Sequence, residues 1–470
     1  MSVPITSLAQ MRHWENATWA TGQTAAEVIR RVGWCLAQRA LQLTRPNDLI
    51  LLLAGKGHNG DDARAAQSHL ADRRVALLNV DSPKVGLPQL EVELANPPAL
   101  IIDGLLGIGL NRQLDADWCA FIRRLNSAPA TILAVDVPSG LQADTGEAQG
   151  AAIQATVTLT IGAPKPGLLR LQAAKFVGRL EVAAEVGLIP CPHTAELNWT
   201  TPDDFRNFPP ARPVASHKGS YGHLGILAGS AGFHGAAVLA ARGAQRAQPG
   251  LITVLTQSPA YYPVAAQLQS AMVNMWSPAA PVPAEFSAVL MGPGLAAPDL
   301  PEALRISTRQ LWRDSLRPVV VDASALDWLP LDQAPSSATR VITPHPGEAA
   351  RLLKTTPAQI QENRPAAVRE LSQRLGDCWV VLKGHQTLIG RSTGELFVNP
   401  SGNPQLAQGG SGDLLAGFIA GLLAQPALAV AVGRTLRYAV WQHGRAADVL
   451  SARKRNWTVE DLADELGQAS

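Results

Sequence analysis

NPQLAQGGSGDLLAGFIAGLLAQP, residues 403–426, changes from a polar, glycine-rich stretch into an almost wholly apolar one, and Asp413 stands at the change. The apolar run continues to Gly433 and is nearly long enough to cross a bilayer. Much of it is Ala and Gly, however, which gain little from lipid, and the Gln-Pro pair at 425–426 ends one helix and begins another. We therefore predict two buried helices.

Two interpretations remain open for the start of this segment. Ser411 and Asp413 are residue types that cap helix N-termini. Alternatively, Gly409, Gly410 and Gly412 let the backbone approach an anion, and the free N–H groups of the helix start bind it. In that case Asp413 could take a proton from a substrate hydroxyl while the N–H groups stabilise a phosphoryl group. The rest of the sequence has to decide between them.

The composition describes a globular chain without an excess of either charge. With 470 residues and 46% hydrophobic content, the chain can form two buried cores. It has 40 Lys plus Arg against 38 Asp plus Glu, so we expect neither a nucleic acid nor a membrane partner. The four cysteines lack metal-binding spacing, and the N-terminus lacks an apolar signal core. We therefore expect a cytoplasmic protein.

A Pro-rich, polar stretch over residues 188–220 has no clear periodicity and is typical of a connecting segment. We place the domain boundary near Pro209, which gives domains 1–208 and 209–470. Cys191 and His193 are close together in this stretch, but without a second pair they indicate an exposed linker more than a metal site.

Short apolar runs alternate with helical patterns in the N-terminal half and predict a Rossmann-like parallel sheet covered by helices. The runs are DLILLLAG (48–55), RVALLNVD (74–81), ALIIDG (99–104), TILAVDVPSG (131–140) and ATVTLTIG (155–162). Ligands of such sheets bind at the carboxyl ends of the strands. We therefore expect the segment after the first run to lie close to Asp103 and Asp136.

That segment, GKGHNG at 55–60, matches the G-x-G-x-x-G pattern of dinucleotide-binding proteins, and Asp81 lies where a ribose-binding acid is expected. It continues as Asp61-Asp62, however, which places two carboxylates where a pyrophosphate needs neutral donors. On spacing alone, these two residues could equally be a solvated, helix-capping pair.

Four motifs of this half resemble the NAD(P)H-hydrate epimerase family: GKGHNGDDA (55–63), IIDGLLGIGLNRQL (101–114), AVDVPSGLQADTG (134–146) and TIGAPKPGLL (160–169). The resemblance implies that K⁺ is bound by Asn59, Asp103 and Ser139, whose oxygen atoms suit a hard cation. It also implies that Asp136 is catalytic. The substrate would contact His58, Asn59, Gly60, Asp61, Asp62, Gly107, Ile108, Gly109, Leu110, Asn111, Arg112, Gln113 and Asp136.

Purely structural roles are also compatible with these residues. Asp103 and Asp136 could cap the loops after their strands, Ser139 could belong to a turn, and Lys165 could be an exposed turn lysine.

Three positions depart from the family pattern: His58 replaces an Asn, and Asp61 and Ala63 replace glycines. Asp61 adds a negative charge that would repel an anionic dinucleotide. The sequence therefore predicts an epimerase activity that is weaker than the activity of the C-terminal half, or absent.

The C-terminal half begins with residues 217–256, which read as strand, glycine-rich turn, helix and strand. Gly229, Gly232 and Gly235 could admit a dinucleotide, although a plain strand-to-helix turn would contain similar glycines.

Further motifs follow in order: AVLMGPGLA (288–296), PVVVDASAL (318–326), RVITPHPGEAARLL (340–353), CWVVLKGHQTLI (378–389) and the GGSGD of the opening segment. They are similar to the ADP-dependent NAD(P)H-hydrate dehydratases, which have a ribokinase-like α/β fold. Joined to an epimerase-like half, they resemble the bifunctional nicotinamide nucleotide repair enzymes. The substrates implied are NADHX and NADPHX, and the cofactors are ADP as phosphoryl donor, in a site of ATP-binding type, and Mg²⁺.

The resemblance gives Asp413 a chemical role. The hydroxyl of a hydrated nicotinamide is a poor leaving group, and the family phosphorylates it so that phosphate can depart. Asp413 would be the catalytic base. Substrate would contact Ala236, Gly294, His345 and Asp413, and the nucleotide would contact Lys383, Gly384, His385, Gln386, Thr387 and Gly412.

Alternatives stay open here too. His345 could simply fill a turn, and Lys383 could be an ordinary strand-end lysine. Ser324 replaces a usual Asp that could help to place Mg²⁺, and Gln408 replaces a usual Thr. The rival interpretation of the whole chain is a vitamin or sugar-like kinase of the ribokinase fold with a non-catalytic nucleotide-binding N-terminal module. We expect a homo-oligomer in either case.

Overall fold

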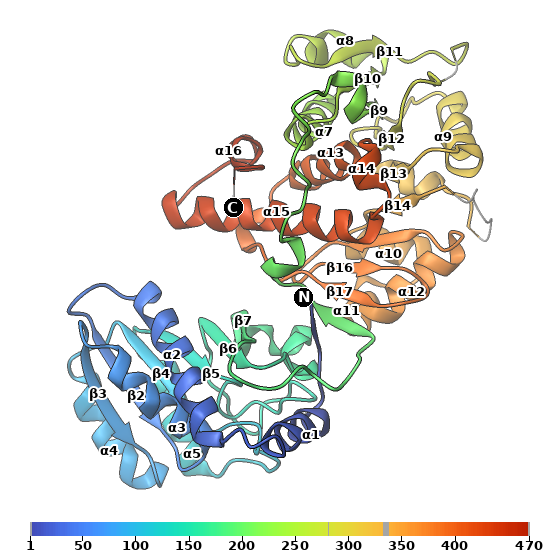
Figure 1. Cartoon of the computed structure of the whole chain (residues 1–470). Helices are drawn as coiled ribbons and strands as arrows, with labels where there is room; N and C mark the ends of the chain where they lie inside the picture. The colour runs from blue at the N-terminus through green and yellow to red at the C-terminus, as the bar shows by residue number, and fades with distance from the viewer. Residues whose placement is uncertain (1, 281, 332–337, 469–470) are drawn as a thin grey trace. The chain divides into compact units, whose positions relative to one another are not determined.

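The computed structural model describes residues 2–280, 282–331 and 338–468 (Figure 1). The chain folds as two compact units, one of Val3–Ala195 and a second that begins at Glu196. The predicted boundary near Pro209 therefore falls inside the second unit. The reason is strand β8 (Leu197–Trp199), which pairs in parallel with β17 (Leu396–Val398) of the second sheet.

The sheet of the first unit has six strands in the order β3-β2-β4-β5-β6-β7, and every neighbouring pair is parallel. The strands are β2 (Leu49–Ala54), β3 (Arg74–Asn79), β4 (Leu100–Gly104), β5 (Thr131–Val135), β6 (Val157–Ile161) and β7 (Arg179–Ala183). The first five coincide with the predicted runs, so the Rossmann-like prediction is confirmed; β7 had not been predicted.

Helices cover both faces of this sheet, which is why its strands are apolar on both sides. In β2, Ile50 and Leu52 pack against α2 and α3, whereas Leu51 and Leu53 pack against α4 and α5. The helices are α1 (Leu8–Trp19), α2 (Ala25–Leu43), α3 (His58–Ala66), α4 (Pro83–Leu94), α5 (Ala116–Asn126) and α6 (Ala174–Val177), with 3-10 turns η1 (Gln67–His69), η2 (Pro166–Leu169) and η3 (Leu171–Ala173). A short strand, β1 (Val3–Pro4), precedes α1.

The sheet of the second unit runs β8-β17-β16-β15-β14-β13-β12-β9-β10-β11. Only β16 is antiparallel to its neighbours; the other described pairs are parallel. The remaining strands are β9 (His223–Leu227), β10 (Leu251–Thr256), β11 (Met272–Met275), β12 (Ala288–Met291), β13 (Val319–Val321), β14 (Arg340–Ile342), β15 (Trp379–Leu382) and β16 (Leu388–Gly390). This largely parallel sheet with covering helices is the predicted α/β architecture.

The helices of the second unit cover this sheet and complete its core (Figure 1). They are α7 (His234–Ala247), α8 (Ser258–Ala265), α9 (Glu302–Asp314), α10 (Pro346–Leu353), α11 (Pro357–Glu362), α12 (Arg364–Arg374), α13 (Ser411–Leu423), α14 (Pro426–Ala429), α15 (Val432–Arg453) and α16 (Val459–Glu465), with 3-10 turns η4 (Pro202–Phe205), η5 (Lys218–Tyr221), η6 (Ala323–Trp328) and η7 (Pro404–Leu406).

The apolar segment that follows Asp413 is helical and buried, as predicted. Every residue of α13 from Leu414 to Leu423 is buried, and Gln425 is the N-cap of α14. Among the residues that the structure describes, no helix is long and apolar enough to span a membrane.

Helix α13 contacts α7 almost backbone to backbone. A Cβ atom on Gly417 would lie 1.8 Å from the carbonyl oxygen of Ala240, and one on Gly243 would lie 2.0 Å from the carbonyl oxygen of Leu414. Only glycine fits at these two positions, because any side chain would push the helices apart. The contact fixes the place of α13, and with it the position of Asp413 at its start.

Candidate active sites

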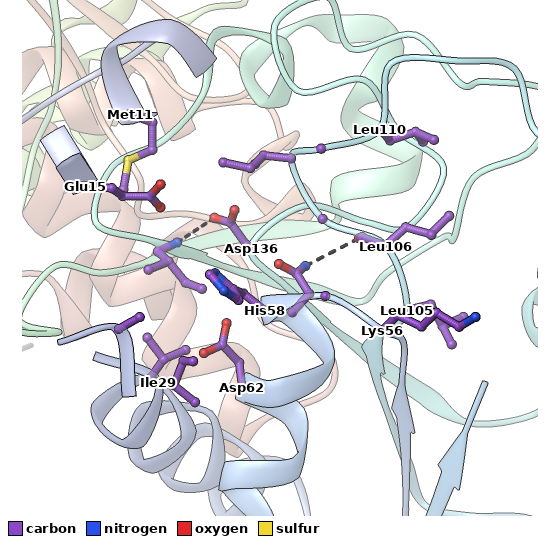
Figure 2. Close-up of a pocket in the computed structure, with 18 of the residues that line it drawn as sticks. Met11, Glu15, Ile29, Lys56, His58, Asp62, Leu105, Leu106, Leu110 and Asp136 are labelled. Carbon is purple, nitrogen blue, oxygen red and sulfur yellow. Dashed lines mark hydrogen bonds between the residues drawn. The ribbon is translucent and has the colours of Figure 1, made fainter. Parts of the chain in front are cut away.

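A cavity of about 700 Å³ lies in the first unit where β2, β4 and β5 end (Figure 2). This is the predicted edge of the sheet. Of the residues predicted to bind substrate, those that line the cavity are His58, Asn59, Asp62, Gly107, Ile108, Gly109, Leu110, Asn111, Arg112 and Asp136. Gly60, Asp61 and Gln113 are not part of its lining.

Asp136 follows β5 directly and has a left-handed backbone, with φ of 63°. One carboxylate oxygen, Oδ1, accepts hydrogen bonds from the Thr160 hydroxyl at 3.0 Å and from the Ile161 amide at 2.9 Å. The ammonium of Lys165 also contacts Oδ1. The alternative of an exposed turn lysine is wrong, because Lys165 is completely buried. Asp136 is therefore held by several donors and is more than a loop cap.

Asp103 and Ser139 are in direct contact below this cavity. The Ser139 hydroxyl donates to Asp103 Oδ1 at 2.6 Å and its amide donates to Oδ2 at 2.8 Å. Burial raises the pKa of Asp103 to about 6, against the lowering effect of the bonds from Ser139.

Asn59 reaches the same place through its amide, which donates to the Val135 carbonyl at 2.7 Å and the Leu106 carbonyl at 3.4 Å. The Leu106 amide in turn donates to the Ser139 hydroxyl at 2.8 Å. The three predicted K⁺ ligands, Asn59, Asp103 and Ser139, are thus brought together through Leu106, and a carboxylate, a hydroxyl and an amide oxygen form a donor set that fits a hard cation.

No larger metal cluster accompanies this set: within the described part of the chain, no group of three or more His, Cys, Asp or Glu side chains could hold a metal ion. Cys191 and His193, predicted to be exposed, are instead partly buried, and His193 Nε2 lies 3.1 Å from His13 Nδ1.

Four carboxyl groups line the cavity: Glu15 from α1, Asp62 from α3, Asp81 after β3, and Asp136 after β5. Figure 2 labels Glu15, Asp62 and Asp136. Burial, reinforced by the charge of Asp136, raises the pKa of Asp62 to about 8 and also raises the pKa of Glu15. Asp62 is therefore a buried acid and no solvated cap. Sequence reasoning missed Glu15, because nothing in its own helix marks it as a cavity residue.

Asp61 does not face the ligand space, contrary to the sequence argument. Its carboxylate pairs with Arg64 at 2.8 Å, and Arg64 also donates to the Gly55 carbonyl at 2.8 Å. Ala63 is buried in the core between α3 and the sheet. The Asp61–Arg64 pair could have been predicted from its i,i+3 spacing on a helix.

In the second unit, Asp413 lies in the first turn of α13, whose N-cap is Gly410 with φ of 92°. Gly410 has no side chain, so the interpretation of Ser411 and Asp413 as N-cap residues is wrong. Burial, followed by the charges of Asp322 and Glu348, raises the pKa of Asp413 to about 7 against the opposing effect of Lys383. The Ser411 amide donates to the Gln408 carbonyl at 3.3 Å, whereas the amides of Gly412 and Asp413 have no acceptor among the described residues and are available to an anion.

Lys383 lies beside this helix start. Its ammonium is 2.7 Å from Asp322 Oδ1 and 3.9 Å from Glu348 Oε2, and a Cβ atom on Gly412 would be 3.3 Å from it. Burial works against the charge of Lys383, but Asp322 and Glu348 together with Asp413 outweigh it and raise its pKa. Lys383 is therefore part of a charged network and no ordinary strand-end lysine.

Sequence reasoning missed both carboxylates that hold Lys383. Asp322 follows β13 and also accepts from the Thr343 hydroxyl at 2.7 Å, and Glu348 lies in the first turn of α10. Their positions in the sequence could have marked them as site residues, because Asp322 follows a buried strand and Glu348 lies at the start of a helix.

Arg364 holds the loop of residues 384–387, which is predicted to bind the nucleotide. It donates to the carbonyl of Leu382 at 3.1 Å and to the carbonyls of His385 and Gln386. Burial lowers the pKa of Arg364 to about 10. Gly384 has φ of 138°, which only glycine adopts easily.

His345 is the N-cap of α10. Its Nδ1 accepts from the Gly347 amide at 3.0 Å, and its own amide donates to Glu348 at 2.8 Å. The structure thus supports the turn-filling alternative, while the ring itself is 53% exposed. Contact of His345 with substrate stays a prediction.

Gly294, in the loop after β12, and Ala236, in the first turn of α7, lie next to each other. A Cβ atom on Gly294 would lie 3.0 Å from Ala236 Cβ and 2.3 Å from the Phe233 carbonyl oxygen, and Gly294 has φ of 66°. The Ser230 hydroxyl donates to the Gly294 carbonyl at 2.6 Å. The loop after β9 and the loop after β12 therefore meet at one point. Contact of Ala236 and Gly294 with substrate stays a prediction.

Comparisons with known proteins agree with this division into two sites. A family model described as NAD(P)H-hydrate dehydratase matches residues 224–469, and one described as YjeF-related protein N-terminus matches residues 79–167. The bifunctional NAD(P)H-hydrate repair enzyme Nnr of Coxiella burnetii is 33% identical over 93% of this chain and 93% of its own length. The chain belongs to this family of repair enzymes. The Escherichia coli member is 35% identical over 92% of this chain and 86% of its own length.

A solved structure supports the assignment of the second unit. The ADP/ATP-dependent NAD(P)H-hydrate dehydratase of Bacillus subtilis, co-crystallised with ATP and Mg²⁺, has a TM-score of 0.50 and 29% identity and covers 55% of this chain and 92% of that protein. In the first unit, the matched range begins at residue 79, after helix α3, which contains the family departures His58, Asp61 and Ala63.

Proposed function

We propose that this repair enzyme restores NADH and NADPH from their hydrates, NADHX and NADPHX. The second unit dehydrates the S epimers at the expense of ADP, and the first unit interconverts the R and S epimers. The observation that carries the proposal is Asp413, a carboxylate placed at the amide-bearing start of α13 beside Lys383.

Asp413 would act as the base in the dehydration. It takes the proton of the substrate hydroxyl as the oxygen attacks the terminal phosphorus of ADP, and AMP leaves. The new phosphate ester is a good leaving group, so phosphate departs as the ring nitrogen lone pair restores the reduced nicotinamide. A pKa of about 7 gives Asp413 enough basicity and still leaves much of it ionised near neutral pH.

The nucleotide would bind along Lys383–Thr387 and at Gly412. Lys383 and the amides of the α13 start offset phosphate charge, and the loop fixed by Arg364 receives the AMP portion. Mg²⁺ would be held by carboxylate oxygens of Asp322 and Glu348, the donor type that it prefers. Asp322 supplies the carboxylate that Ser324 lacks.

The epimerase site would be the cavity of the first unit, with Asp136 in contact with the substrate and K⁺ on Asn59, Asp103 and Ser139. The charge argument for a weak epimerase loses its support, because Asp61 is paired with Arg64 outside the cavity lining.

The deciding experiment supplies the S epimer of NADHX with ADP and Mg²⁺. Recovery of the absorbance of reduced nicotinamide, with release of AMP and phosphate, supports the proposal. A kinase of the ribokinase fold would instead leave the phosphate on its product, and a stable phosphorylated hydrate would contradict the proposal. A homo-oligomer and a cytoplasmic location stay predictions from the sequence.

A further inference from the structure

Lys165, between β6 and η2, is completely buried in the first unit. Besides Asp136, its ammonium contacts the Thr160 hydroxyl at 3.0 Å and the Ile161 carbonyl at 3.1 Å. An ammonium taken out of water costs several kcal/mol unless a carboxylate and further hydrogen bonds compensate it. Asp136 is the carboxylate that compensates Lys165.

The contacts of Asp136 are distributed unevenly over its two oxygens. Thr160, Ile161 and Lys165 all donate to Oδ1. Among the described residues, none donates to Oδ2. Asp136 lines the cavity, whereas Lys165 does not, so the lysine lies behind the carboxylate as seen from the ligand space. One oxygen is therefore fully engaged by the protein, and the other is left for a ligand.

Without Lys165, the negative charges on the cavity side would repel the carboxylate of Asp136. Glu15 and Asp62 face the same space, and the charge of Asp136 acts on both. The basic side chains that line the cavity are Arg12, Lys56, His58 and Arg112, and among the described residues none of these four contacts Asp136. Lys165 is the cation in direct contact with Asp136 among the residues described.

We propose that Lys165 is a positioning residue of the epimerase reaction, which clamps Oδ1 of Asp136 so that Oδ2 meets the substrate. The inference rests on the proposed epimerase function of the first unit. Lys165 itself does not touch the substrate; it acts through the carboxylate.

The test uses Lys165→Met in the full-length chain, which removes the ammonium and keeps most of the side-chain length. With ADP and K⁺ present, the S epimer is exhausted first, and consumption of the R epimer is then measured above its spontaneous rate. A misplaced reacting group costs about a hundredfold in rate. We expect kcat for the R epimer to fall by about this factor with little change in KM, while dehydration of the S epimer, in the other unit, is unchanged.

Thr158→Val is the matched control for a purely structural effect. Thr158 is on β6, the strand that precedes Lys165. It is equally buried and donates to the Val177 carbonyl at 2.7 Å, but it does not contact Asp136. We expect its epimerase rate to stay within about twofold of the wild type, and thermal unfolding checks that both variants fold.

Rescue separates positioning from packing. Lys165→Ala leaves a space beneath Asp136, and added ethylammonium should restore at least about a tenth of the lost rate, whereas ethanol, similar in size but uncharged, should not.

The possible outcomes distinguish a failure of the proposed epimerase function from a failure of the role proposed for Lys165. If the wild-type chain shows no epimerisation above the spontaneous rate, the proposed function of the first unit is wrong and the inference falls with it. If the wild type is active and Lys165→Met keeps near-normal kcat, only the inference is wrong. Equal losses in Lys165→Met and Thr158→Val, or rescue by ethanol, would show a structural role and overturn it as well.

Discussion

The dehydration rate should follow the ionisation of Asp413. The proposed base works only as a carboxylate, and burial raises its pKa to about 7. A group with this pKa is ionised to about 9% at pH 6 and about 91% at pH 8. The kcat/KM for the S epimer should therefore rise about tenfold between these two pH values and level off above them.

Two charged neighbours of Asp413 allow a test of whether this residue sets the pH dependence. Lys383 lowers the pKa of Asp413 and Glu348 raises it. Lys383→Met should therefore move the midpoint of the pH profile to higher pH, and Glu348→Gln should move it to lower pH. ADP also ionises in this range, but a change in the protein moves the midpoint only if a protein group sets it.

The assay follows the absorbance of reduced nicotinamide at saturating ADP and Mg²⁺ across the pH range. Asp413→Asn keeps the shape of the side chain and removes the base, so its rate should be at least about a hundredfold lower at every pH. Its affinity for ADP, measured by calorimetry, should change little. A flat wild-type profile, equal shifts in the two neighbour variants, or near-normal turnover of Asp413→Asn would each refute the reasoning.

Three further substitutions test the nucleotide site, the helix packing and the acidic cavity. Gly412→Val places a branched side chain close to the ammonium of Lys383, 3.3 Å from the Cβ position, so ADP affinity should fall; an unchanged calorimetric affinity would place the nucleotide elsewhere. Gly417→Val would press against the Ala240 carbonyl, 1.8 Å from the Cβ position. We expect a loss of about 3 kcal/mol in the free energy of unfolding, and a denaturant titration showing less than about 0.5 kcal/mol would contradict it. Asp62 has a folded-state pKa of about 8 against an ordinary value of 3.8, so the folded state keeps a proton that the unfolded state has lost, and stability falls as pH rises between these values. Asp62→Asn should thus unfold at a higher temperature than the wild type near pH 8, by a margin that shrinks toward about pH 4; a margin independent of pH would count against the buried acid.

The sequence predicted the arrangement of the first unit well, because parallel strands covered on both faces read as continuous apolar runs. The candidate site residues lie at the ends of those runs, so the order of residues alone was enough to place Asp103 and Asp136 at one edge of the sheet. The same reasoning placed Asp413 at a helix start.

Contacts between distant segments could not be predicted in this way. Lys165 lies between two prolines and reads as a surface turn, and its burial depends on a carboxylate that follows a different strand. Asp322 and Glu348 are likewise brought to Lys383 only by the fold. These cases share a cause: a buried charge is explained by its partner, and the partner is far away in sequence.

The domain boundary was placed too late for a related reason. β8 has three residues, too few for a periodic pattern, and it is recognised as a strand only by its pairing with β17 near residue 397. A Pro-rich linker was a sound expectation for the stretch, but it could not show which end belongs to the second sheet.

The close contact between α13 and α7 also has a practical consequence for protein engineering. Replacing a glycine inside a helix by alanine commonly gains about 0.5–1 kcal/mol, because the unfolded chain loses freedom. In α13 the same exchange at Gly417 or Gly421 would bring the new methyl group to 1.8 Å from the Ala240 carbonyl or 2.7 Å from Ala247 Cβ. A library designed to raise heat resistance should therefore leave α13 unvaried, since the substitutions that such designs favour would displace Asp413, the proposed catalytic base, at its first turn.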